Sequence, residues 1–215
     1  ILNKILLSLP FLEKILVDGK INNTSGFTKV RSPYLYGEVS ISRTARYFPV
    51  NFVFKPLLIL SAVFLFLYWK NNLNLFKSLN NQNIITNFSK KFFYFGSFSA
   101  LFLILHAIFL GINFESKIFL NFRRLIIILF IVFEVIAQFM LTINLFKVKE
   151  KIIQHINPLI LKIKIWFVVS ILLITITSLI YLIFLNPTYN FKNILEWNYF
   201  TFLLLYYFLT RLMWK

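Results

Sequence analysis

Two ionisable side chains lie inside long apolar segments of the chain, and their types suit the transfer of a proton or the binding of a polar group. They are His106, within residues 92–114, and Glu134, within residues 125–146. An ionisable group in hydrocarbon is costly, so each is a candidate functional residue. A histidine beside a carboxylate can hold a proton and pass it on. The same two residues could instead form a polar clasp between helices that does no chemistry.

Other polar residues recur at helical spacing around this pair. Steps of seven residues in the first segment and of four in the second place the side chains on one face of each helix. The two sets are Ser99, His106 and Asn113, and Glu134, Gln138 and Thr142. If the segments end near Phe114 and Leu125, a rise of about 1.5 Å per residue puts His106 and Glu134 at a similar depth. We therefore predict that the two polar faces meet between antiparallel helices.

The segments that position these residues are predicted to be transmembrane helices. A helix needs about 20 largely apolar residues to cross a hydrocarbon core of about 30 Å. Five segments meet this requirement: residues 51–69, 92–114, 125–146, 165–185 and 197–214. Residues 1–16 are predicted to be either the end of a truncated sixth span or an interfacial helix. The predicted fold class is all-α, a polytopic transmembrane helical bundle forming a single domain over residues 1–215.

The composition supports a bilayer as the solvent and excludes several kinds of site. The chain is 59% hydrophobic and 14% charged, whereas about 25% of residues are charged in soluble domains. The absence of cysteine excludes disulfides, cysteine-bound zinc and iron–sulfur clusters. The two histidines lie at different predicted depths, which disfavours a bis-histidine haem, so we expect neither a cofactor nor a metal site. The net charge of +16 is expected to face anionic lipid, and no nucleic-acid partner is expected.

The distribution of Lys and Arg predicts the orientation. The side of the membrane that holds residues 70–91, 147–164 and 215 carries eleven basic residues, and the other side carries nine. Five of those nine lie in a long loop over residues 17–48, and without this loop the comparison is eleven against four. The positive-inside rule then places the C-terminus in the cytoplasm and the loop at residues 17–48 outside it.

Two groups of basic residues are candidates for binding lipid headgroups. Arg43, Arg46 and Tyr47 lie where the chain returns to the membrane, and Arg123 and Arg124 lie just before the segment at residues 125–146. Guanidinium groups bind phosphate through paired hydrogen bonds, and a helix N-terminus adds to that attraction. Simple anchoring at the membrane surface is the alternative for both groups.

A short motif adds a resemblance to a known family. Residues 40–54 read SISRTARYFPVNFVF, which gives the pattern S-x-S-R-x-x-R-x-x-P-x-N-x-x-F. This segment, together with the compact spans, resembles the six-span FRAG/DRAM-type membrane proteins, whose eukaryotic members act in lipid remodelling of GPI anchors or in autophagy. The resemblance implies a lipid-associated role, and no catalytic residue carries over from it.

Three functional hypotheses remain at this stage. The leading one is a multi-span protein that binds or handles membrane lipids, with the loop and the His106–Glu134 pair as its site. The others are a non-catalytic subunit or assembly factor with protein partners in the membrane, and a small proton-coupled transporter. The motifs of common hydrolases and nucleotide triphosphatases are absent from the sequence, so whether the protein is an enzyme stays open.

Overall fold

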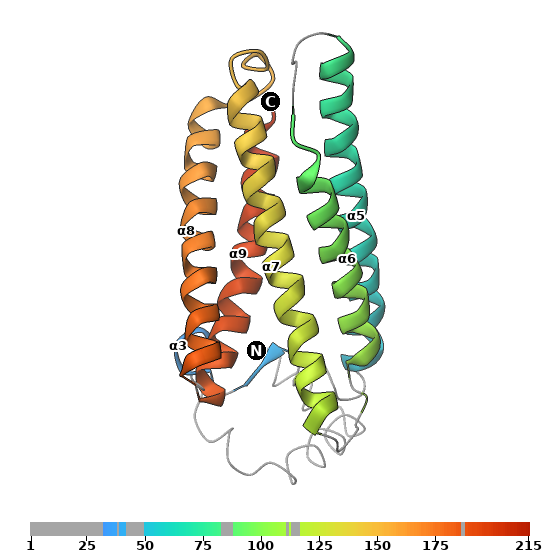
Figure 1. Ribbon diagram of the computed structural model, residues 1–215, viewed down its shortest axis with the longest axis vertical. Coiled ribbons are helices and arrows are strands. Elements are labelled where there is room, and N and C mark those ends of the chain that lie inside the picture. Colours follow the sequence, from blue (N-terminus) through green and yellow to red (C-terminus); the bar gives the residue numbers. More distant parts are fainter. Residues whose placement is uncertain are drawn as a thin grey trace, which may run out of the picture.

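The computed structural model is a bundle of long helices that run alternately up and down (Figure 1). It describes residues 32–37, 39–41, 50–82, 88–110, 112, 117–185 and 188–215. Within these ranges the chain forms six helices: α3 (Pro33–Tyr36), α5 (Val50–Asn81), α6 (Lys91–Phe109), α7 (Lys117–Val148), α8 (Pro158–Phe184) and α9 (Tyr189–Met213). Helix α6 packs against α5 and α7, α8 packs against α7 and α9, and α3 packs on α9. The predicted all-α class is confirmed.

Four of these helices are long and apolar enough to cross a membrane. Among the described residues they are α5, α6, α8 and the part of α7 from Asn121 to Val148. The protein is therefore a multi-pass helical membrane protein by composition. Helix α9 has 25 residues, which is long enough to cross, but Glu196, Arg211 and its tyrosines lower its hydropathy. The segment at residues 1–16, predicted as a sixth span or interfacial helix, lies outside the described residues.

Four helices, α5, α7, α8 and α9, extend beyond the predicted spans, and α9 starts eight residues early, at Tyr189. Helix α5 continues to Asn81, twelve residues beyond the span predicted at residues 51–69. Leu73 and Phe76 are buried on this extension. The side-chain amide of Asn72 donates to the carbonyl oxygen of Tyr68 (2.8 Å), so this polar side chain has a partner within the helix. Helix α8 likewise starts early, at Pro158, because Asn157 caps it by accepting from the N–H of Leu159 (3.1 Å). Helix α7 starts eight residues earlier than predicted, at residue 117.

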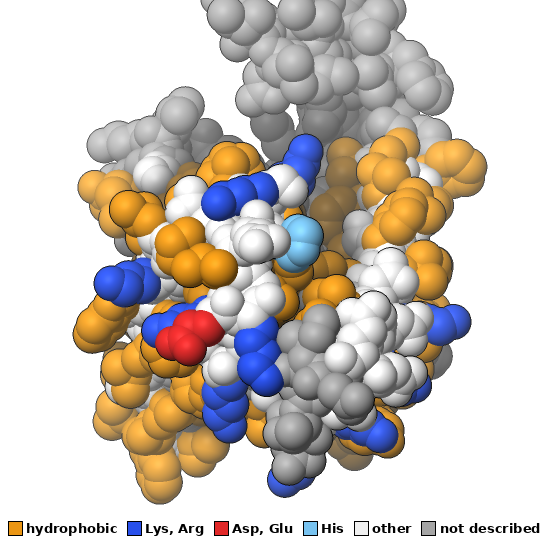
Figure 2. Space-filling model, turned by 90° about the horizontal axis from the view of Figure 1, so that it is seen from above, with side chains coloured by type: hydrophobic (Ala, Val, Ile, Leu, Met, Phe, Trp, Pro, Cys, Tyr) orange, Lys and Arg blue, Asp and Glu red, His pale blue; other side chains and the backbone are white. Residues whose placement is uncertain are grey.

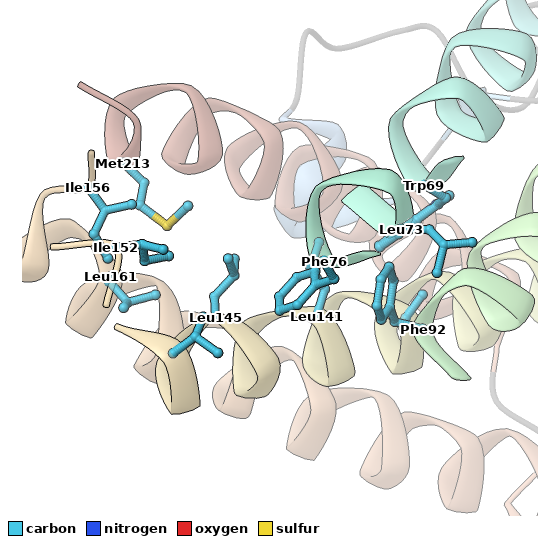
Figure 3. Close-up of a cluster of buried hydrophobic side chains, with 12 residues drawn as sticks. Trp69, Leu73, Phe76, Phe92, Leu141, Leu145, Ile152, Ile156, Leu161 and Met213 are labelled. Carbon is cyan, nitrogen blue, oxygen red and sulfur yellow. The ribbon is translucent and has the colours of Figure 1, made fainter. Parts of the chain in front are cut away.

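The largest core lies towards the end of the bundle where α9 finishes, and Figure 3 shows its side chains. Trp69 and Phe76 of α5 meet Phe92 of α6 there, and Leu141 and Leu145 of α7 lie beside them. In a bilayer the surrounding lipid is as apolar as these side chains, so helices associate through close packing more than through removal from water.

Gly96 is the residue that lets α5 and α6 come together in this core. A Cβ atom at this position would collide with the indole carbons of Trp69, and Trp69 is fully buried. Small residues at helix interfaces have this role in membrane proteins.

The same end of the bundle is closed by backbone pairing. The turn between α7 and α8 contacts the residues after α9: the N–H of Asn157 donates to the carbonyl oxygen of Met213 (2.8 Å), and the N–H of Lys215 donates to that of His155 (2.9 Å). Ile156 and Trp214 form an isolated antiparallel bridge between these two bonds. Lys and Arg side chains are spread over this end, and hydrophobic side chains surround them (Figure 2).

At the other end, part of the predicted outer loop packs on the first turns of α9. Asn193 donates to the carbonyl oxygen of Gly37 (2.7 Å), and the indole N–H of Trp197 donates to that of Val39 (2.8 Å). Tyr34 packs edge-on against the ring of Trp197, with 5.6 Å between centroids. Residues 32–37 and 39–41 therefore belong to the bundle. The other residues of the loop predicted at residues 17–48, including residue 38, lie outside the described residues.

Candidate functional site

Glu134 is the centre of a buried polar network between three helices. The carboxylate accepts from Ser99 of α6 at Oε2 (2.6 Å) and from the side-chain amide of Gln138 at Oε1 (3.0 Å). The hydroxyl of Tyr207 in α9 donates to Oε1 as well. Thr142 continues the face by donating to the carbonyl oxygen of Gln138 (2.7 Å). Glu134 is 1% exposed, so its oxygens are satisfied by protein donors inside the span.

The network pairs Glu134 with a different residue of α6 from the one predicted. Ser99 lies near the middle of α6, as Glu134 lies near the middle of α7, whereas His106 is three residues from the end of α6. The equal depth predicted for His106 and Glu134 is wrong because α6 ends at Phe109 and α7 starts at Lys117. Ser99 and His106 are about 10 Å apart along the axis at 1.5 Å per residue. His106 is 8% exposed and lines the same cavity as Glu134.

A second buried polar group lies next to the network. Lys164 of α8 is fully buried, donates to the hydroxyl of Thr210 in α9 (2.7 Å) and lies 4.2 Å from the ring centroid of Tyr206. The Tyr206 hydroxyl is buried and makes no hydrogen bond within the described part of the chain, and the same holds for Tyr68. Lys164 therefore lies inside the bundle, although the sequence placed it in a basic loop.

A cavity lies between α5, α6, α7 and α9, and the Glu134 network forms the end that lies nearer the middle of the bundle, called its inner end below. Its volume is about 530 Å³, within the range of about 300–1,000 Å³ typical of ligand sites. Tyr68, Glu134 and Tyr207 form one end, and Phe54, His106 and Glu196 lie nearer the other. Most of the remaining lining is aliphatic or phenylalanine: Leu58, Leu65, Leu103, Ile127, Ile131 and Phe130 are examples.

The candidate headgroup-binding residues have other partners where the structure describes them. Arg124 donates to the Tyr189 hydroxyl (2.8 Å) and to Asn121 Oδ1 (3.5 Å), so it connects α7 with the start of α9. Arg123 is 9% exposed and donates to the carbonyl oxygen of Ile112 (3.5 Å). The remaining candidates, Arg43, Arg46 and Tyr47, lie outside the described residues, and headgroup binding stays a prediction. Asn113, predicted on the polar face of Ser99 and His106, also lies outside them.

Four residues of the site were missed in the sequence. Tyr68 and Tyr207 lie in predicted spans and Glu196 lies just before one, but none was assigned to a polar face, and Lys164 was counted among loop charges. A signal was available for α9, since Tyr199, Tyr206, Thr210 and Met213 recur at steps of seven, four and three residues and all four are buried. That spacing identifies the inward face of a helix, and Tyr207 lies next to it.

Comparisons with protein-family models, curated proteins and solved structures found no match to this chain. The resemblance drawn from residues 40–54 accordingly stays a hypothesis.

Proposed function

We propose that this protein binds the hydrocarbon chain of a lipid in the cavity between α5, α6, α7 and α9. The observation that carries this function is the cavity itself, because it has ligand size, an apolar lining and a few polar groups gathered at one end. This combination is typical of sites for small amphipathic molecules. The lipid-associated role implied by the FRAG/DRAM resemblance fits such a site.

The surface of the bundle gives a lipid chain a way in. Phe64 on α5 is 61% exposed, and Phe200 and Leu204 on α9 are 45% and 56% exposed. All three also line the cavity, so the cavity reaches the surface between α5 and α9. In a bilayer this surface faces acyl chains, and a chain can move sideways into the cavity without crossing water.

The length of the cavity suits a single chain. Phe54 and Tyr68, which lie towards its two ends, are 14 residues apart in α5, or about 21 Å at 1.5 Å per residue. Half of a hydrocarbon core of about 30 Å is shorter than this. A chain that fills one leaflet can therefore lie in the cavity along its whole length.

The proposal includes α9 as a fifth span and an orientation for the bundle. Helix α9 lies beside α8 over its length (Figure 1), and the end where it finishes carries Lys147, Lys151, Lys162, Arg211 and Lys215 on its surface. Without Lys164, and with the loop at residues 17–48 again left out, ten basic residues lie on the side where α9 finishes and four lie on the other side. The positive-inside rule therefore still assigns the end where α9 finishes to the cytoplasm.

Native mass spectrometry of the purified full chain tests lipid binding. We expect a stoichiometric lipid on the unaltered protein and its loss in Ile131→Trp and Leu203→Trp, which fill the cavity. Leu173→Trp is the matched control, because Leu173 is 59% exposed on α8 and is not among the residues that line the cavity. The protein could instead purify with a protein partner and without lipid, with the same composition in all three variants. That result would favour the subunit hypothesis and overturn the proposal.

A further inference from the structure

The charge of the cavity lining is opposite to that of the chain. The chain has 23 Lys and Arg but only seven Asp and Glu. Glu134 and Glu196 both line the cavity, and no Lys or Arg is found among the described residues that line it. A phosphate or carboxylate headgroup would meet like charge there, so the lining disfavours the usual anionic end of a lipid.

The groups around Glu134 can satisfy a charged carboxylate. Three donors, from Ser99, Gln138 and Tyr207, converge on its two oxygens, and an ionised carboxylate is purely an acceptor. Within the described residues, Lys164 is the buried lysine, and it donates to Thr210 instead. A carboxylate inside a membrane is costly without a positive partner, so a cation is expected to come from outside the chain.

Two tyrosine rings complete the surroundings of such a cation. The rings of Tyr68 and Tyr207 stand at 86° to each other with centroids 5.0 Å apart, and both line the cavity beside Glu134. Aromatic faces attract ammonium groups, most strongly where water is excluded. Together the carboxylate and the two rings form a corner suited to an ammonium group at the inner end of an apolar channel.

We infer that the ligand of this cavity is a cationic amphiphile, a long alkyl chain ending in a protonated amine that pairs with Glu134 between Tyr68 and Tyr207. This inference rests on the proposed function, since it names the chemical class of the chain that the same cavity holds. The alkyl chain lies along the apolar lining towards Phe54 and Phe200.

The test compares three probes of equal chain length that differ in their polar end. Hexadecylamine, hexadecanol and hexadecanoate are titrated separately into the delipidated full chain at neutral pH, and native mass spectrometry gives each affinity. We expect hexadecylamine to bind at least tenfold more tightly than the alcohol or the acid. This comparison uses the unaltered protein, so it does not depend on whether a variant folds.

Variants then place the cation. Glu134→Gln should abolish the preference for the amine over the alcohol. Glu150→Gln, which removes the same charge from the exposed turn after α7, should keep that preference. If Glu134 is protonated, the three probes should bind equally. Equal binding would overturn the inference of a cationic ligand but leave the proposed binding of a hydrocarbon chain intact. Tightest binding of the acid also overturns it, and failure of all three probes to bind overturns the proposed function itself.

Discussion

The hydroxyl group of Ser99 in α6 donates a hydrogen bond of 2.6 Å to Oε2 of Glu134 in α7. Ser99 is fully buried and Glu134 is 1% exposed, and hydrocarbon offers neither group another partner. Sliding α6 along α7 would break this bond, whereas the apolar contacts around it could be replaced by similar ones. The pair therefore fixes the alignment of the two helices and holds the carboxylate at the inner end of the cavity.

Removing the Ser99 hydroxyl should destabilise the bundle. Ser99→Ala leaves one oxygen of Glu134 without its donor, and we expect a loss of about 1–2 kcal/mol in the free energy of unfolding, at the upper end for hydrogen bonds within membranes. Unfolding in mixed micelles measures this change.

Ser97 offers a matched control on the same helix. Its hydroxyl is buried and makes no hydrogen bond within the described residues, so Ser97→Ala should change the free energy of unfolding by less than about 0.5 kcal/mol. Equal effects of the two variants would show that the Ser99–Glu134 bond contributes nothing to stability.

Gly96→Ala should separate α5 from α6. The added methyl group collides with the Trp69 ring, which the core holds in place, and overpacking of this kind costs about 1–3 kcal/mol. Thermal unfolding of the purified protein measures it. In a Trp69→Ala background the colliding atoms are gone, so the same substitution should cost much less. An undiminished cost there would contradict the close approach.

Gly37→Ala should release residues 32–37 and 39–41 from α9. Gly37 has φ +59°, and a Cβ atom would collide with the carbonyl oxygen of Asn190. Since left-handed backbone costs about 1–2 kcal/mol in other residues, exchange of the Trp197 indole N–H, which donates to the carbonyl oxygen of Val39, should rise about tenfold or more. Ser32→Ala is the control, because the Ser32 side chain is exposed and caps nothing. Unchanged exchange in Gly37→Ala would mean that the docking tolerates a side chain.

The Lys164–Thr210 pair should respond unequally to loss of its two members. Lys164→Met removes the buried charge and keeps most of the volume, so stability should stay within about 1 kcal/mol of the original or increase. Thr210→Val leaves the ammonium group without its acceptor and should cost more. Unfolding of both variants under identical conditions compares them, and a greater loss in Lys164→Met would indicate that the charge itself is needed.

The sequence predicted the helices and the polar face of α7 because both follow from local periodicity. Residues 51–69, 125–146 and 165–184 all lie in helices that the structure contains, and Glu134, Gln138 and Thr142 are all buried on one face. These properties depend on residues within a few turns of each other.

The partners across helices could not be predicted in the same way, because they depend on where each helix ends. An error of five residues at the end of α6 and eight at the start of α7 was enough to put His106 opposite Glu134 in place of Ser99. Tyr207 is 73 residues from Glu134, and no local pattern reports a contact at that separation. Lys164 resembled a loop charge because the capping by Asn157 was not recognised as the start of α8.

The network of Glu134 also has an order in time. When a ribosome makes this chain, Ser99 precedes Glu134 by 35 residues and Gln138 follows four residues after it, so both donors are present once α7 has been made. Tyr207 is made only after the whole of α8. Helix α9, the least apolar of the long helices, is then added to a bundle that already contains Glu134. The hydrogen bond from Tyr207 to Glu134 can stabilise α9 in its position. In the proposed five-span arrangement, membrane insertion of α9 should thus depend on a residue in a helix made long before it.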